Sequence, residues 1–133
     1  EKGVLFLADR YATSNIVYQL VKLPQEQWKE YIRWMEDFEY GRLGIPRPNL
    51  VVYLDVPADV SQKLLSSRYH GDNSQKDIHE RDFTFQQRCR ACALYAAEVQ
   101  GWKVIPCTSK GQMRPVEEIS EEILRLVTEI CPV

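Results

Sequence analysis

The sequence predicts an α/β fold in which a parallel sheet carries helices on both faces. Three short apolar runs, each bounded by polar or turn residues, have the pattern of strands buried on both sides; they occupy residues 4–8, 50–54 and 102–105. Segments with helical periodicity separate and follow these runs, and they are long enough for right-handed crossovers. We therefore expect residues 1–133 to form one domain with a three-layer α/β/α arrangement.

Apolar residues repeat at intervals of three and four along the segments expected to be helical. The segment after Pro24 shows this well, because Trp28, Tyr31, Ile32 and Met35 share one helix face. The expected helices span residues 13–21, 25–40, 59–67, 82–100 and from 115 onward. The residues that the last helix is expected to bury are Val116, Ile119, Ile123, Val127 and Ile130.

The charge balance and the lengths of the apolar stretches argue against nucleic-acid and membrane partners. The chain has 17 basic and 19 acidic residues, a formal charge of −2, whereas a duplex-binding surface requires a basic excess. No apolar stretch approaches the about 20 residues that cross a bilayer, and the first residues do not resemble a signal peptide. We therefore predict a cytoplasmic protein without nucleic-acid or membrane partners.

Cys89 and Cys92 form a C-x2-C pair that suits either a metal site or a helix core. A zinc site would require further ligands nearby, and the only histidines are His70 and His79. The two cysteines also continue a helical stripe, whose other members are Phe85, Ala96 and Val99. We therefore expect the pair to be thiols packed in the core.

Polar residues follow each expected strand. Asp9, Arg10 and Tyr11 come after the first apolar run, Asp55 ends the second, and residues 107–112 follow the third. In parallel sheets, ligands bind beyond the carboxyl ends of the strands. An arginine there offers a planar fork to a phosphate or carboxylate, and an aspartate could hold magnesium or orient a nucleophilic oxygen. The same pair would also form an ordinary turn with a surface ion pair, and spacing does not decide between these interpretations.

A polar loop follows the helix expected at residues 59–67. Residues 66–77 lack apolar periodicity and contain a glycine, with Arg68 at their start and Lys76 at their far side. Asp77 and Glu80 follow at i and i+3. Basic groups on a loop that closes would serve phosphoryl transfer, whereas the alternative is an exposed loop whose charges are only solvated.

Two segments, "DRYATSNIVYQ" and "GIPRPNLVVYLDVPADVSQKLLSSR", resemble thymidylate kinase, the nucleoside monophosphate kinase that phosphorylates dTMP with MgATP. The family pattern joins D-R-Y/H, a serine three residues later, P-x-P-D-L, a strand ending L-D-V and a helix that runs to a lid arginine. The matching residues are Asp9, Arg10, Tyr11, Ser14, Tyr18, Gln19, Pro46, Pro48, Leu50, Leu54, Asp55, Val56 and Arg68. The resemblance covers essentially the whole chain and implies a P-loop-kinase-like sheet with flanking helices.

The resemblance implies a role for individual residues. Arg10 would grip the acceptor phosphate, Asp9 would act on Mg²⁺ and that phosphate, and Arg68 would hold phosphoryl groups as the lid closes. Asn15 and Tyr18 would contact the thymidine, with Tyr18 near the sugar. The full implied substrate-binding set is Arg10, Tyr11, Ser14, Asn15, Tyr18 and Gln19, and the implied lid near residues 66–80 carries Arg68, Lys76, Asp77 and Glu80.

The resemblance also implies a homodimer, and we expect the helices at 13–21 and 25–40 to supply its apolar surface through Trp28, Trp34 and Phe38.

Some features depart from the family pattern. Asn49 replaces the usual aspartate, an expected aromatic falls on Ala93, and no G-x-x-x-x-G-K-[ST] motif occurs. We therefore expect the chain to be a partial domain, the C-terminal part of a longer enzyme, and to be inactive alone. Two alternatives are a deoxynucleoside kinase, which has another motif in place of D-R-Y, and a non-catalytic nucleotide-binding or dimerisation module.

Overall fold

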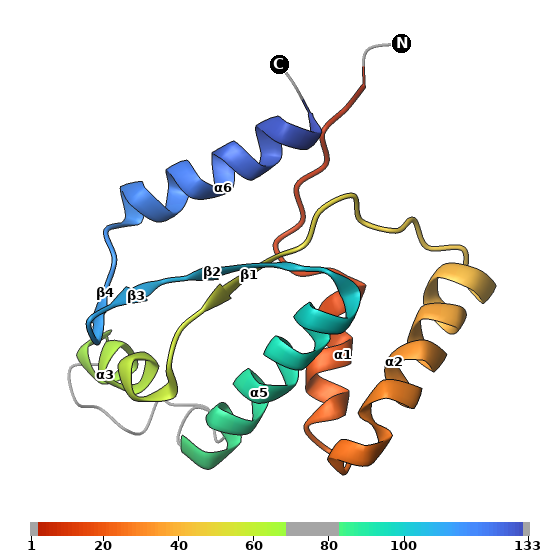
Figure 1. Ribbon diagram of the computed structural model, residues 1–133, viewed down its shortest axis with the longest axis horizontal. Coiled ribbons are helices and arrows are strands. Elements are labelled where there is room, and N and C mark those ends of the chain that lie inside the picture. Colours follow the sequence, from red (N-terminus) through yellow and green to blue (C-terminus); the bar gives the residue numbers. More distant parts are fainter. Residues whose placement is uncertain (1–2, 69–82, 132–133) are drawn as a thin grey trace.

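The computed structural model describes residues 3–68 and 83–131, so the predicted lid residues Lys76, Asp77 and Glu80 lie outside the described residues. The described residues form both helices and short strands, which confirms the mixed α/β class (Figure 1). The helices are α1 (Ala12–Leu20), the short 3₁₀ helix η1 (Gln25–Gln27), α2 (Trp28–Glu36), the π-helix η2 (Asp37–Arg42), α3 (Ala58–Arg68), α5 (Phe83–Gln100) and α6 (Val116–Ile130). The strands are β1 (Val52–Asp55), β2 (Lys103–Pro106), β3 (Thr108–Ser109) and β4 (Gln112–Met113).

Two of the three predicted strands are confirmed. β1 and β2 pair in parallel, with Val52 opposite Lys103 and Asp55 opposite Pro106, so each strand lies one or two residues later than expected. A short antiparallel hairpin of β3 and β4 follows β2. Lys110 and Gly111 at its turn have φ of 52° and 76°, as the favoured two-residue hairpin turns require.

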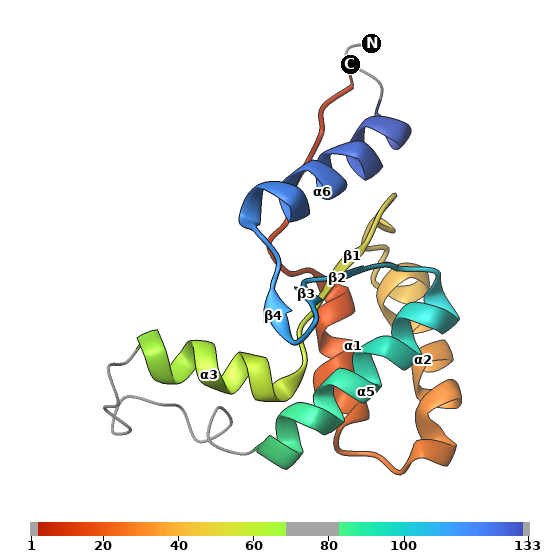
Figure 2. The same ribbon diagram turned by 60° about the vertical axis from the view of Figure 1, so that its left-hand side comes forward.

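The prediction of a strand at residues 4–8 is wrong for the described structure. The segment is unpaired, and Val4 is 92% exposed. It runs past the C-terminal end of α6 toward α1 instead of lying beside β1 (Figures 1 and 2). A strand exists only through hydrogen bonds to a neighbour, so apolar composition alone does not produce one.

The core lies on one side of the β1–β2 pair, where α1, α2 and α5 pack together (Figure 1). The indole N–H of Trp28 donates to the carbonyl oxygens of Leu20 at 3.0 Å and Leu23 at 3.1 Å, which closes the turn between α1 and α2. The Trp28 ring also contacts Tyr95 of α5, with ring centroids 5.3 Å apart. The buried core residues are Ile16, Leu20, Val21, Trp28, Ile32, Met35, Cys92 and Ala96.

The predicted helical stripe of α5 is confirmed at Cys92 and Ala96, which are fully buried, and Cys89 packs against the same core. The prediction is wrong for Val99, which lies in the last turn of α5, outside the core cluster, and is half exposed. Burial raises the pKa of Cys92 to about 11 and also raises the pKa of Cys89. Within residues 3–68 and 83–131, no group of three or more His, Cys, Asp or Glu side chains could hold a metal ion.

α6 lies on the other side of the β1–β2 pair from α1, α2 and α5 (Figures 1 and 2). The prediction that α6 buries its apolar residues is wrong, because none is buried and Val116 is 76% exposed. Ile119, Ile123 and Val127 are partly covered and Ile130 is exposed. An amphipathic helix is buried only where a second surface meets its apolar face, and a two-stranded sheet offers little such surface.

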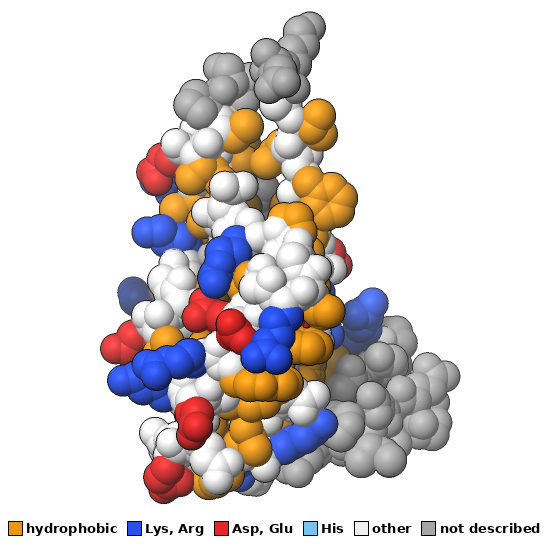
Figure 3. Space-filling model, turned by 90° about the vertical axis from the view of Figure 1, so that its right-hand side faces the viewer, with side chains coloured by type: hydrophobic (Ala, Val, Ile, Leu, Met, Phe, Trp, Pro, Cys, Tyr) orange, Lys and Arg blue, Asp and Glu red, His pale blue; other side chains and the backbone are white. Residues whose placement is uncertain are grey.

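The outer surface of α2 carries a row of aromatic rings. Trp34 stacks on Phe38 with centroids 5.4 Å apart and planes 4° from parallel, and Tyr31 lies 5.7 Å from Trp34. Trp34 is 54% exposed, whereas the prediction that Trp28 also supplies an exposed apolar surface is wrong, because its ring is buried in the core. Figure 3 shows this side of the molecule, where hydrophobic side chains lie between basic and acidic ones.

None of the helices in the described part of the chain has the length and apolar content that a membrane span requires. The cytoplasmic location stays a prediction.

We expect the thiols to differ sharply in reactivity. Near neutral pH, an alkylating reagent should modify exposed Cys131 long before Cys92, because Cys92 is fully buried and its raised pKa leaves little thiolate. Mass spectrometry of the labelled peptides against time measures both rates, and a denatured sample provides the control. Equal rates in the native protein would contradict the core position of Cys92.

Candidate functional site

The turn before α1 holds a strained arginine. Arg10 has a backbone φ of 69°, in the left-handed region that residues other than glycine rarely adopt. Such a conformation costs about 1–3 kcal/mol and persists only where the surrounding structure imposes it. Tyr11 then returns to an extended conformation and caps α1. The turn therefore directs the Arg10 side chain by backbone geometry.

The Arg10 guanidinium lies over the ring of Tyr18, with Cζ 5.5 Å from the ring centroid. Two residues predicted for one site are thus brought together from the turn and from the second turn of α1. A cation over an aromatic face is attracted by about 0.5–1 kcal/mol at an exposed position. The contact limits the movement of the guanidinium while the residue remains exposed to solvent.

The predicted substrate-binding residues share one face of α1. Tyr11, Ser14, Asn15 and Tyr18 recur at i, i+3, i+4 and i+7, with Gln19 beside them, so they line the side of the helix opposite its buried residues. Asn15 and Tyr18 are exposed, and the other three are partly exposed.

Tyr11 connects the exposed face of α1 to the segment that precedes β1. Its hydroxyl donates to the carbonyl oxygen of Pro46 at 2.8 Å. Polar residues were expected beyond the carboxyl ends of the strands, and the ends of β1 and β2 do adjoin, since the Cys107 N–H donates to the Asp55 carbonyl oxygen at 2.9 Å. The Arg10 turn is joined instead to the loop before β1.

Glu39 is a site residue that sequence reasoning missed. It lies in η2 and is only 5% exposed. Its Oε2 atom is buried without a hydrogen-bond partner, and burial raises the pKa of the carboxyl group. The signal was present, because Glu39 continues the stripe of Ile32 and Met35 at i, i+3 and i+7, where an acidic residue is out of place.

A second missed feature joins β1 to α5. Arg90 binds Asp55 through two hydrogen bonds, Nε to Oδ1 at 2.6 Å and Nη2 to Oδ2 at 2.8 Å. This planar bidentate contact raises the pKa of Arg90 through its hydrogen bond to Asp55. Arg90 lies in the first half of α5 and Asp55 is the last residue of β1, so the pair connects this half of α5 to the end of the sheet.

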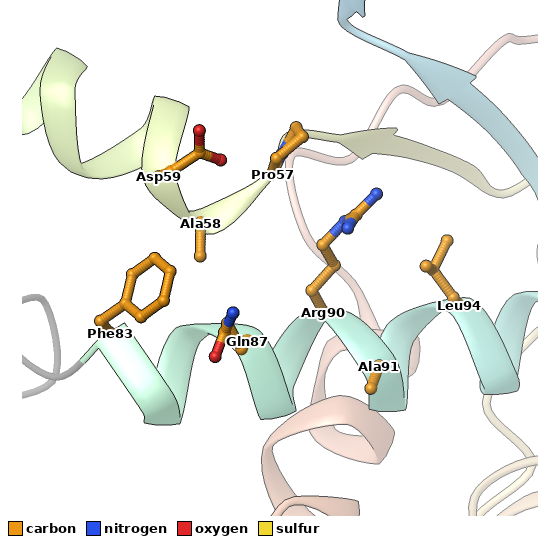
Figure 4. Close-up of a pocket in the computed structure, with 8 residues that line it drawn as sticks. All are labelled: Pro57, Ala58, Asp59, Phe83, Gln87, Arg90, Ala91 and Leu94. Carbon is orange, nitrogen blue, oxygen red and sulfur yellow. The ribbon is translucent and has the colours of Figure 1, made fainter. Parts of the chain in front are cut away.

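A pocket of about 340 Å³ lies beside this pair, between the start of α3 and the first half of α5 (Figure 4). Figure 4 shows Phe83, Gln87 and Arg90 projecting from α5 toward Ala58 and Pro57. None of the predicted site residues in the described part of the chain lines it. The lining residues are Pro57, Ala58, Asp59, Phe83, Gln87, Arg90, Ala91 and Leu94.

Two further predicted residues lie on the surface. Asp9 is exposed beside Arg10, and Arg68 is the exposed last residue of α3. The structure brings Arg10 and Tyr18 together, whereas the expectation that Arg68 lines the same cleft stays a prediction.

The family model described as thymidylate kinase matches residues 1–123. A thymidylate kinase of Mycobacterium tuberculosis is 33% identical over 97 residues, which cover 72% of this chain and 45% of the relative. A thymidylate kinase of Fervidobacterium nodosum is 29% identical over 127 residues, which cover 95% of this chain and 57% of the relative. The chain thus spans about half the length of the curated relatives it matches. No solved structure gives a significant match.

We expect the Asp55–Arg90 pair to stabilise the fold. Replacing Arg90 by Met should lower the free energy of unfolding by about 1–3 kcal/mol, because Asp55 is mostly buried and would lose two charge-assisted hydrogen bonds. The matched control is Arg42→Met, which removes an ion pair that is exposed on both sides and should change stability little. Denaturant unfolding of the full-length variants measures both, and equal effects would contradict a special role for Asp55–Arg90.

Proposed function

The chain belongs to the thymidylate kinase family, and we propose that the full-length protein transfers the γ-phosphoryl group of ATP to dTMP, giving dTDP. One observation supports this proposal more than any other. Arg10 is held in a strained backbone conformation above Tyr18, at the end of a helix face that carries the other predicted substrate-binding residues. Residues with a strained backbone are enriched at ligand-binding sites, whereas a surface ion pair forms without backbone strain.

In the proposed reaction, the Arg10 fork binds two oxygens of the acceptor phosphate. A third oxygen of that phosphate then attacks the γ-phosphorus of ATP, and ADP leaves. Catalysis of this kind depends on positioning and on neutralising the charge that spreads over the transferred group. Arg10 supplies both, because its charge is permanent and the Tyr18 ring limits its movement.

Mg²⁺ with ATP fits the residues present. Mg²⁺ keeps several waters and is held by one or two carboxylates together with substrate phosphates, so the single exposed carboxylate of Asp9 beside Arg10 is a suitable ligand. When bound, the ion would neutralise negative charge on the phosphate groups. We propose that Arg68 joins this site from the lid, together with Lys76, Asp77 and Glu80.

Contacts to the nucleoside are proposed for the exposed face of α1. Asn15 would contact the base and Tyr18 the sugar, whereas Tyr11, Ser14 and Gln19 would complete the wall of the acceptor site. The 133 residues contain no phosphate-cradling G-x-x-x-x-G-K-[ST] motif, so we propose that they do not turn over substrate by themselves.

We also propose that the protein is a homodimer whose interface includes the aromatic row of α2 and η2. Trp34 and Phe38 are exposed and stacked on each other, which presents a flat apolar surface. Aromatic residues are enriched at the centres of protein interfaces, where a buried ring removes a large apolar area from water.

The dimer proposal predicts that Trp34→Glu produces monomers. A charge at the centre of an apolar interface is desolvated without a partner, so sedimentation velocity at micromolar concentration should show a dimer for the native protein and a monomer for this variant. Leu124→Glu, on the exposed surface of α6, should leave the dimer intact. A native protein that sediments as a monomer would count against the proposal.

Arg10→Lys tests the proposed activity. Lysine keeps the charge and loses the fork, so kcat/KM for dTMP should fall roughly ten- to a hundredfold, which corresponds to the loss of a charge-assisted hydrogen bond of about 1.5–3 kcal/mol. The melting temperature should hardly change. Arg125→Lys, at an exposed position of α6, is the control and should leave both quantities unchanged. Unchanged kinetics for Arg10→Lys would show that the D-R-Y segment is only a turn.

A further inference from the structure

Tyr11 occupies a position where its residue type does not serve the helix that follows. It is the N-cap of α1, where serine, threonine, aspartate and asparagine stabilise a helix by accepting a hydrogen bond from one of its free N–H groups. The Tyr11 side chain makes no such bond. Capping of α1 therefore does not account for a tyrosine here, and the contact that its side chain makes elsewhere becomes the point of interest.

The hydroxyl of Tyr11 reaches a segment 35 residues farther along the chain. It donates its single hydrogen to the carbonyl oxygen of Pro46 at 2.8 Å. Residues 3–9, on the other side of the turn, are exposed and pair with no strand in the described part of the chain. The bond to Pro46 therefore holds the D-R-Y turn against the rest of the molecule.

The carbonyl group of Pro46 is itself held from both sides. Before it, the Ile45 N–H donates to the Glu39 carbonyl oxygen at 3.0 Å. After it, the guanidinium of Arg47 pairs with the Glu36 carboxylate at 3.2 Å. The proline ring fixes φ between these two anchors. The Pro46 oxygen is therefore a fixed acceptor whose place is set by α2 and η2.

The bond bears directly on Arg10, because the two residues are neighbours in the turn. The backbone passes from the left-handed region at Arg10 to an extended conformation at Tyr11, with φ of −147° and ψ of −172°. α1 fixes the backbone of Tyr11, since the Ser14 N–H donates to its carbonyl oxygen at 2.9 Å, and Pro46 fixes its ring. Strain persists only where the surroundings impose it. With Tyr11 held at both ends, Arg10 keeps the strained conformation that carries its guanidinium over Tyr18.

We propose that Tyr11 is a positioning residue for the acceptor phosphate, whose hydrogen bond to Pro46 holds the Arg10 fork in the orientation that binds that phosphate. This inference rests on the proposed function, because it takes the acceptor phosphate as the ligand of Arg10. The Tyr11 hydroxyl does not touch the phosphate and acts only through Arg10. A fork that is already in place loses less conformational freedom when its ligand binds, and this raises the affinity.

The test is Tyr11→Phe in the full-length protein, which removes the hydroxyl and keeps the ring. Calorimetric titration with dTMP and with thymidine separates the phosphate from the nucleoside. The Kd for dTMP should rise roughly three- to tenfold, the range that one neutral hydrogen bond covers, whereas the Kd for thymidine should be unchanged. kcat/KM for dTMP should fall by a similar factor, with the KM for ATP unchanged.

Tyr95→Phe is the matched control. It also removes one hydroxyl, from a ring that packs against Trp28 on the other side of α1, and it should leave both dissociation constants as they are. The melting temperature of Tyr11→Phe should change little, because its hydrogen bond is exposed and water replaces the lost partner.

A double mutant tests the route through Arg10. Arg10→Ala should weaken the binding of dTMP and leave that of thymidine unchanged, since it removes the proposed ligand of the phosphate. Adding Tyr11→Phe to Arg10→Ala should cause no further change, because a residue that acts only by placing the guanidinium has no effect once the guanidinium is gone.

The outcomes are distinguishable. If Arg10→Ala weakens dTMP binding but Tyr11→Phe does not, the positioning role is overturned and the proposed function stands. If Tyr11→Phe weakens dTMP and thymidine equally, or still acts when Arg10 is alanine, Tyr11 contacts the nucleotide directly and the inference is again overturned. If the native protein neither binds nor phosphorylates dTMP, the proposed function fails, and this inference fails with it.

Discussion

The hydrogen bonds of one indole group organise the helical part of this molecule. Trp28 donates to the carbonyl oxygens of Leu20, the last residue of α1, and of Leu23 in the turn that follows. The same ring packs against Tyr95 of α5. One buried side chain therefore ends α1, starts α2 and joins both to α5. The relative position of α1 and α2 depends on this packing.

Three residues or segments near the candidate site depart from the conformation or burial that their sequence would favour. Arg10 adopts a left-handed conformation that glycine would adopt without strain, η2 departs from α-helical geometry, and Glu39 places an acid on an otherwise apolar stripe. Natural sequences are locally consistent with their fold except where function demands otherwise. Because these three departures adjoin the polar face of α1, they support one site more strongly than any of them does separately.

The apolar surfaces that stay exposed have a common physical origin. Residues 4–7 have the composition of a buried strand, and α6 has the pattern of a helix packed on a sheet, yet both depend on a partner surface. The hydrophobic pattern of a helix or strand shows which of its faces should be buried, but burial also requires a second apolar surface that packs against that face. In the described structure only β1 and β2 form the parallel sheet, so one face of α6 remains in contact with solvent.

The sequence by itself determined the elements whose signals are local. Periodicity placed α1, α3, α5 and the start of α6 to within one or two residues, and apolar runs located β1 and β2. The helix expected at 25–40 is divided into η1, α2 and η2. The D-R-Y segment drew attention to Arg10, and the structure brings Arg10 onto Tyr18. Tertiary structure alone decided that residues 4–8 stay unpaired, that α6 stays exposed, that Arg90 binds Asp55 and that Glu39 is buried. Helical periodicity arises within a few residues of chain, whereas strand pairing, burial and the contacts of a charged side chain depend on groups that are distant in sequence.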